Sequence, residues 1–141
     1  MGGSAGGFTA LNVAAAHPDL VAAVIALYPV TDLLDLAATT HRFKSGDLSR
    51  LVGRLPDARE AYVARSPITQ AANVRAPVLL LQGSEDRVVN PERTAAFAAA
   101  LLAGGTHVEH NVYAGEGHGW RRADTVTDEL SRIAAFLNRW L

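Results

Sequence analysis

The stretch PVLLLQ, residues 77–82, which Gly83 ends, decides the fold class of this 141-residue chain. It is short and continuously apolar until its last residues, a pattern typical of a parallel strand that is buried on both faces. Two other runs have a similar length: Val21–Tyr28, which Pro29 ends, and Val108–Tyr113. The last run is more polar, so we expect it nearer an edge of the sheet. About three parallel strands are therefore predicted.

Helical patterns surround these runs, at Gly6–Ala16, Pro91–Ala103 and Asp124–Leu141. The second has a proline in its first turn and glycines after its end, as helices often do. Alternating helices and strands predict an α/β fold with right-handed crossovers.

Residues 41–67 interrupt the alternation of helices and strands. Short helical pieces are expected there, around Gly46–Val52 and Asp57–Arg65. The segment follows the first predicted strand, where a lid over an active site would lie. We therefore interpret it as a short helical insertion.

The composition excludes several classes of protein. Hydrophobic residues make up 49% and charged residues 19% of the chain, as in a folded globular domain. The net charge of −1 gives no electrostatic basis for binding nucleic acid or an acidic membrane. The chain has no cysteine, which excludes disulfides, thiolate zinc sites and a cysteine nucleophile. No apolar run approaches the roughly 20 residues of a membrane span, so a cytoplasmic protein is expected.

A first chemical motif is Gly2-Gly3-Ser4-Ala5-Gly6, which matches G-x-S-x-G. In that motif a serine sits on a strained turn between a strand and a helix, where only small neighbours fit. The helix N-terminus would direct the Ala5 N–H toward an oxyanion. A glycine-rich terminal tail is the alternative interpretation, because the pentapeptide alone is a weak signal.

A second motif lies directly off the end of the strand predicted at residues 77–82: Gln82-Gly83-Ser84-Glu85-Asp86-Arg87-Val88-Val89-Asn90-Pro91. Open parallel sheets carry functional residues at this end of their strands. An acid there can orient a histidine, although an acid in a surface turn would look the same. Asp86 has the shorter side chain and is preferred, with Glu85 as the competitor.

A third motif is Gly115-Glu116-Gly117-His118-Gly119-Trp120, between the last strand and the last helix. A neutral imidazole can take a serine proton and return it to a leaving group. An ordinary glycine-rich turn is the alternative for this segment. The remaining histidines have structural explanations at the end of a helix, the start of the insertion or the edge strand: His17, His41, His107 and His110.

The order of the three motifs is more informative than any one of them. A serine at an elbow, an acid after a strand and a histidine after the last strand follow the chain order of α/β-hydrolases.

On these residues the chain resembles the prolyl-oligopeptidase family of serine peptidases, especially its acylaminoacyl-peptidase-like and dipeptidyl-peptidase-like branches. The resemblance implies Ser4 as nucleophile, Asp86 as orienting acid and His118 as general base, acting on short peptides with no metal or organic cofactor. The resembling segments are Gly2–Gly7, His17–Leu20, Tyr28–Asp32, Arg65–Ile68, Pro77–Gly83, Asp86, Pro91 and Gly115–Gly119.

Two departures from the family pattern affect the expected function. Ala5 stands where peptidase members often carry an aromatic residue, and alanine there is common in carboxylesterases, so a small ester is the alternative substrate. Met1 lies one residue before the serine motif, whereas the family has a full strand and further segments upstream. Residues 1–141 are therefore interpreted as the C-terminal half of a catalytic domain.

The small number of residues before the serine motif is expected to have physical consequences. Ser4 is expected on a disordered end, with low activity because a second oxyanion donor would come from upstream. The open sheet edge is expected to self-associate or to bind the missing N-terminal half. An inactive chain that serves at most as an interaction module is the alternative.

Overall fold

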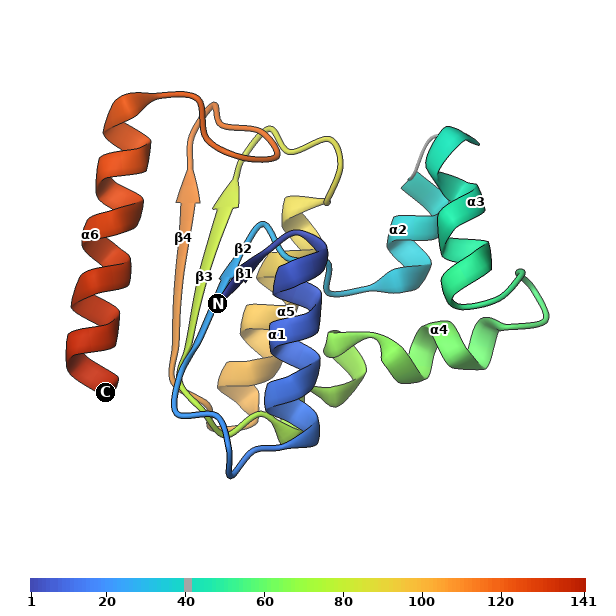
Figure 1. Ribbon diagram of the computed structural model, residues 1–141, viewed down its shortest axis with the longest axis horizontal. Coiled ribbons are helices and arrows are strands. Elements are labelled where there is room, and N and C mark those ends of the chain that lie inside the picture. The colour runs from blue at the N-terminus through green and yellow to red at the C-terminus, as the bar shows by residue number, and fades with distance from the viewer. Residues whose placement is uncertain (40–41) are drawn as a thin grey trace.

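The computed structural model describes residues 1–39 and 42–141. Within them, a parallel sheet of four strands forms the centre of the molecule, in the order β1-β2-β3-β4 (Figure 1). The strands are β1 (Gly2–Gly3), β2 (Val24–Leu27), β3 (Val78–Gly83) and β4 (Val108–Tyr113). The predicted α/β fold is confirmed, and β4 lies at an edge of this sheet.

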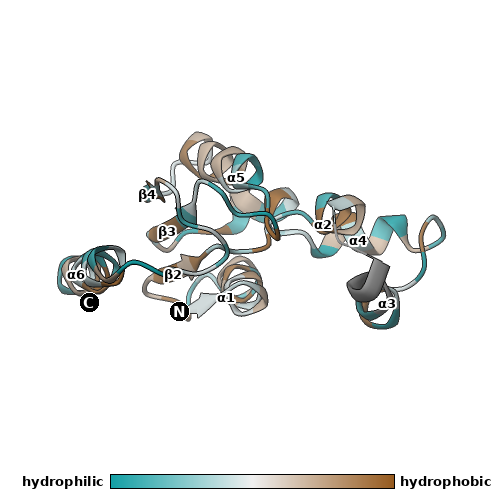
Figure 2. Cartoon of the chain, turned by 90° about the horizontal axis from the view of Figure 1, so that it is seen from above, coloured by the Kyte–Doolittle hydropathy of each residue, from teal (hydrophilic) through white to brown (hydrophobic). Residues whose placement is uncertain are grey.

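Strand β3 explains why its sequence is apolar without alternation. All six of its residues are buried, because both faces of the sheet are covered. Val78 and Leu80 pack on one side with the helices α1 (Ala5–Ala16) and α5 (Pro91–Ala103). Leu79 and Leu81 pack on the other side with Phe136 of α6 (Ala123–Trp140). Figure 2 shows the same three layers from above.

The three long helices lie where the sequence predicts them. Helix α5 begins at Pro91, and the Asn90 side chain accepts a hydrogen bond from the Glu92 N–H at 3.0 Å. Helix α6 buries Phe136, with Ile133 and Leu137 packed beside it. Among the described helices, none is both long and apolar enough to cross a bilayer.

The insertion starts earlier than the sequence predicted. Helix α2 (Leu33–Thr39) already follows β2, because the Asp32 carboxylate accepts hydrogen bonds from the N–H groups of Leu34 and Asp35. Helices α3 (Arg42–Leu51) and α4 (Arg59–Arg65) and a 3-10 helix η1 (Pro67–Asn73) follow. His41, expected at the start of the insertion, lies outside the described residues.

The insertion lies beside the main body (Figure 1), and the two share a small hydrophobic core. Val30, Leu33, Tyr62 and Val89 are its buried members. Val89 lies in the segment that follows Asp86, so the insertion packs at the carboxyl ends of the strands. This position agrees with the predicted place of a lid.

The expected disordered end at Ser4 is not found. Strand β1 pairs with β2 through Gly2 opposite Ala26 and Gly3 opposite Leu27, and the Ser4 N–H donates to the Leu27 carbonyl at 2.9 Å. Two residues are enough to form this pairing, because parallel strands are joined by backbone hydrogen bonds and need no side chains.

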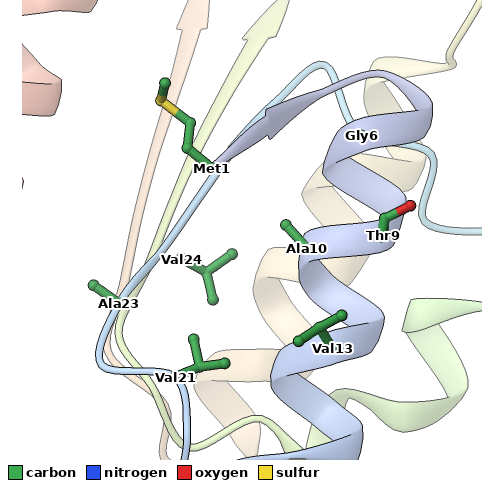
Figure 3. A pocket seen from close by; sticks show the side chains of 8 residues that line it. All are labelled: Met1, Gly6, Thr9, Ala10, Val13, Val21, Ala23 and Val24. Carbon is green, nitrogen blue, oxygen red and sulfur yellow. The ribbon is translucent and has the colours of Figure 1, made fainter.

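An apolar groove lies between α1 and β2, beside the short strand β1 (Figure 3). Among the described residues that line it, none has a titratable side chain, so we do not interpret it as a site of chemistry. Its lining residues are Met1, Gly6, Thr9, Ala10, Val13, Val21, Ala23 and Val24.

Candidate active site

The three predicted site residues follow three different strands of the sheet. Ser4 comes directly after β1, Asp86 lies in the turn after β3, and His118 lies in the loop after β4. Because all strands are parallel, their carboxyl ends meet at one edge of the sheet. Residues 114 positions apart in sequence are thereby brought into contact.

Ser4 has an unusual backbone conformation. Its φ of 54° and ψ of −119° lie in a region that residues with a side chain seldom occupy. Neighbouring hydrogen bonds hold it there: its N–H donates to the Leu27 carbonyl, and its own carbonyl accepts from the Phe8 N–H at 3.1 Å. This is the strained strand-to-helix turn that the G-x-S-x-G motif predicted.

The close approach of β1 and α1 explains part of the glycine pattern. A Cβ on Gly2 would lie 2.4 Å from the backbone carbon of Gly6, so no larger residue fits at Gly2. The predicted need for a small residue at Gly6 is wrong, because a Cβ there would meet nothing within 4 Å. The tight position after the serine is Gly7, where a Cβ would lie 2.8 Å from the Pro29 Cβ.

One hydrogen-bonded row joins the three side chains. The His118 Nε2 lies 2.8 Å from the Ser4 Oγ, and the His118 Nδ1 lies 2.8 Å from the Asp86 Oδ2. An ionised carboxylate can only accept hydrogen bonds, so Nδ1 carries the proton and Nε2 is free to accept the serine proton. This is the tautomer that a general base requires.

Asp86 is held in its ionised form. Burial by itself would raise the pKa of this carboxyl, and its side chain is 0% exposed. Hydrogen bonds from His118 and from the backbone N–H groups of Val89 and Val88 outweigh burial and lower the pKa below its usual value. The side chain of Glu85, the competing acid, is exposed and makes no hydrogen bond to His118.

Aromatic side chains support the imidazole from one side. The ring of Tyr28, at the end of β2, lies edge-on to His118 at 4.7 Å between ring centroids. Trp120 contacts both Tyr28 and Tyr113. Tyr28, which is itself packed against Trp120, thus limits the rotation of the His118 ring, whose side chain is 21% exposed.

Backbone hydrogen bonds join the acid turn to the histidine loop. The Ser84 N–H donates to the Tyr113 carbonyl at 3.0 Å, and the Glu85 N–H donates to the Glu116 carbonyl at 2.9 Å. The Ser84 hydroxyl oxygen also accepts from the Gly115 N–H at 2.9 Å. Asp86 and His118 therefore belong to one connected unit.

The buried carboxylate of Glu116 closes the histidine loop. It accepts hydrogen bonds from the backbone N–H groups of Arg121 and Arg122 at 3.0 and 3.1 Å. Burial would raise the pKa of Glu116, but these hydrogen bonds lower it, so the group stays charged. Glu116 thus holds the chain on the far side of His118.

Gly83 permits the contact between these two loops, and its replacement is expected to reduce activity strongly. A Cβ at this position would lie 2.3 Å from the Gly117 carbonyl oxygen and 2.4 Å from that of Glu116. Gly83→Ala must therefore displace the loop that carries His118, and misplacing a reacting group can lower the rate about a hundredfold. Steady-state hydrolysis and thermal unfolding of the variant test this.

The control for Gly83→Ala is Gly104→Ala, at the end of α5, where the nearest atom to a Cβ would be the Leu101 carbonyl oxygen at 3.3 Å. Unchanged hydrolysis in Gly83→Ala would contradict the close packing of Gly83 against the backbone of Glu116 and Gly117.

The remaining predicted residues also have defined places. Ala5 is the first residue of α1, so its N–H is among the free donors at the helix N-terminus. Among the other histidines, His17 ends α1 while His107 and His110 lie before and within β4, away from the site. Within the described residues, no cluster of three or more His, Asp or Glu side chains could hold a metal ion.

Four residues support the site in ways that the sequence analysis did not predict. Gln82, Gly83 and Glu116 lie within the predicted motifs but were given no role there, and Thr94 was not considered. A signal existed for Gln82, because it is a polar residue in an otherwise apolar run that was predicted to be buried. The other three depend on contacts between segments that only the folded chain brings together.

Comparison with known proteins identifies relatives of this chain. A family model described as the prolyl oligopeptidase family matches residues 1–141. Dipeptidyl peptidase family member 6 of Caenorhabditis elegans is 29% identical over 147 residues, covering 100% of this chain and 20% of the relative. The chain thus spans about a fifth of the length of the curated relatives it matches.

Solved structures have the same fold. A crystal structure of puromycin hydrolase is 42% identical, with a TM-score of 0.88 over 96% of this chain and 20% of that one. A puromycin-hydrolyzing peptidase of Mycobacterium tuberculosis is 39% identical, with a TM-score of 0.94 over 99% of this chain and 21% of that one.

Proposed function

Because the chain belongs to the prolyl oligopeptidase family, we propose that it supplies the nucleophile, the base and the acid of a serine peptidase. The observation that carries the proposal is the row of 2.8 Å contacts from Ser4 through His118 to Asp86. Substrates are short peptides or aminoacyl amides, in keeping with the names of the relatives, and puromycin is the first compound to test.

The reaction proceeds through an acyl-enzyme. The Ser4 oxygen attacks the carbonyl carbon of the scissile amide while the Nε2 of His118 takes the hydroxyl proton. The oxyanion that forms accepts a hydrogen bond from the Ala5 N–H. When the tetrahedral intermediate collapses, the imidazolium gives its proton to the leaving amine. Water, activated by the same imidazole, then releases the acyl group and restores Ser4.

Asp86 acts on this reaction through His118. Its negative charge stabilises the imidazolium that forms in each proton transfer, and its hydrogen bond keeps the ring oriented. Three side chains and the Ala5 N–H carry out this mechanism. As the family resemblance implies, it requires no metal and no organic cofactor.

Ala5 favours a second candidate, an esterase for small acyl esters. A small residue after the nucleophile leaves more room than the aromatic residue that many peptidases of the family carry. The two candidates differ in the leaving group, since an amine must be protonated before it departs and a phenolate need not be.

The proposed function is tested by labelling with a fluorophosphonate probe and by comparing two substrate types. The probe is expected to label Ser4, and peptide mapping identifies the modified residue. Turnover of aminoacyl amides, puromycin included, is compared with turnover of p-nitrophenyl esters. Labelling at another residue, or none in a chain that also contains the upstream segments of its relatives, would reject the proposal. Negligible amide hydrolysis with good ester hydrolysis would favour the esterase.

We also propose that residues 1–141 form the C-terminal half of a catalytic domain and work slowly alone. Relatives about five times as long have further segments, and the family resemblance assigns a second oxyanion donor to one of them. Loss of one such donor lowers kcat by about a hundred- to thousandfold. Adding the upstream segment is expected to raise kcat by that factor, measured on the same amide substrate.

The open edge of the sheet is the proposed contact for such a segment. Strand β1 pairs with only Ala26 and Leu27 of β2, and the apolar groove of Figure 3 lies beside it. Without a partner there, self-association is expected, and size-exclusion chromatography measures it. A cytoplasmic location stays a prediction from composition.

A further inference from the structure

A buried polar chain continues the catalytic row into the core of the protein. Gln82, the penultimate residue of β3, donates from its Nε2 to the Asp86 Oδ2 at 2.9 Å. The Oε1 of Gln82 accepts a hydrogen bond from the Thr94 hydroxyl, also at 2.9 Å. Gln82 and Thr94 are both 0% exposed. The chain therefore runs from helix α5 through the central strand to the catalytic carboxylate.

The charge of Asp86 determines how this chain is oriented. A carboxylate only accepts hydrogen bonds, so the Gln82 amide must present its NH₂ group to Asp86. The amide oxygen then points at Thr94, which must donate. If the amide turned over, its oxygen would face the Asp86 Oδ2, and two buried acceptor oxygens in contact are strongly unfavourable.

The point of contact on Asp86 indicates what the chain does. The Oδ1 of Asp86 accepts from the N–H groups of Val88 and Val89 at 2.8 and 2.9 Å. The Oδ2 accepts from Gln82 and faces the Nδ1 of His118. Gln82 therefore occupies one lone pair of the oxygen that orients the base and leaves the other for His118.

A purely structural role does not account for this arrangement. The centre of a sheet covered on both faces is the place where an apolar side chain is most stable, as its neighbours Leu80 and Leu81 illustrate. Burying an amide there gains little net stability even when all its hydrogen bonds are made. The contact with the catalytic carboxylate is the property that an apolar residue could not replace.

We propose that Gln82 and Thr94 are positioning residues that hold Asp86 in the plane from which it orients His118. The inference rests on the proposed function, because it concerns the same reaction. The Thr94 hydroxyl fixes the orientation of the Gln82 amide, and the amide fixes the orientation of the Asp86 carboxylate. The carboxylate then orients the His118 imidazole toward Ser4.

Thr94→Val is the principal test, because it removes the hydroxyl and keeps the shape of the side chain. We expect kcat and kcat/KM to fall together by about ten- to hundredfold with KM unchanged, the pattern of an interaction that matters in the transition state. Thr94→Ser restores the donor and is expected to recover most of the rate.

Thr106→Val is the matched control. Thr106 is also a buried threonine, and its hydroxyl donates to the Val74 carbonyl at 2.6 Å, at the opposite end of the strands. The same chemical change is expected there to lower the thermal unfolding temperature without changing kcat. An equal loss of kcat in both variants would overturn the proposal, since the loss would then follow stability alone.

A double variant separates positioning from folding. Replacing Gln82 by methionine and Thr94 by valine removes both partners of the Thr94–Gln82 hydrogen bond and takes one donor from Asp86, which keeps its hydrogen bonds with Val88, Val89 and His118. We expect a folded protein with the reduced kcat of Thr94→Val. Wild-type kcat in this double variant would overturn the proposal.

One readout does not depend on turnover. The proton on the His118 Nδ1 between imidazole and carboxylate gives a low-field resonance in ¹H NMR. We expect Thr94→Val to shift or broaden it, Thr94→Ser to restore it and Thr106→Val to leave it in place. An unchanged resonance in Thr94→Val would overturn the inference even in a protein without measurable hydrolysis. Failure of the proposed function shows separately, as absence of fluorophosphonate labelling at Ser4.

Discussion

Replacing Ser4 by alanine is expected to lower kcat for an aminoacyl amide by roughly a millionfold, the loss typical of removing a triad nucleophile. The Ser4 Oγ is the atom that faces the Nε2 of His118 at 2.8 Å, and alanine has no atom that could replace it. The fold should persist, because the structural hydrogen bonds of Ser4 are made by its backbone. Hydrolysis rates and fluorophosphonate labelling of the purified variant measure the effect.

Ser131→Ala provides the comparison for this prediction. Ser131 is exposed on α6, and its hydroxyl donates to the Thr127 carbonyl at 2.9 Å. It makes no hydrogen bond to Ser4, Asp86 or His118. Its replacement is expected to leave hydrolysis and labelling at wild-type levels. If Ser4→Ala kept most of its activity, Ser4 would not be the nucleophile.

Replacing Asp86 by asparagine is expected to lower kcat by about ten thousandfold, through the tautomer of His118. Two backbone N–H groups hold the Oδ1 position, so the asparagine oxygen remains there and its NH₂ group takes the place of Oδ2. That group donates to Nδ1, which must then be unprotonated. The proton moves to Nε2, where the imidazole can no longer accept from Ser4.

The paired variants Glu85→Gln and Asp19→Asn sharpen this test. Asp19 forms only an exposed ion pair with Arg75 at 3.7 Å, so Asp19→Asn is expected to hydrolyse substrates normally. Glu85→Gln removes the competing acid beside Asp86. If Glu85→Gln lost activity and Asp86→Asn did not, the assignment of the orienting acid would be wrong. Thermal unfolding of each variant checks that the losses are catalytic.

Much of the fold could be predicted because strands and helix ends depend on residues that are close together in the sequence. Strand β3 at 78–83 is buried on both faces, and the apolar character of its sequence follows directly from that burial. The bounds of α5 follow from Asn90, Pro91 and Gly104, which act within one turn of the helix ends. The insertion was predicted less well, since α2 depends on Asp32 as its N-terminal cap and that aspartate was not considered as a cap.

For the candidate site, too, some features followed from the sequence and others only from the tertiary structure. The sequence by itself determined the α/β fold class, the chain order of serine, acid and histidine, and the choice of Ser4, Asp86 and His118 as candidates, because motif spacing and chain order are properties of a linear chain.

Only the tertiary structure decided that Gln82 and Thr94 reach Asp86, that Glu116 closes the histidine loop, and that Gly83 lets the two loops touch. These contacts join residues on different strands, helices and loops. Their geometry depends on how the layers pack, and no local pattern of residue types encodes that packing.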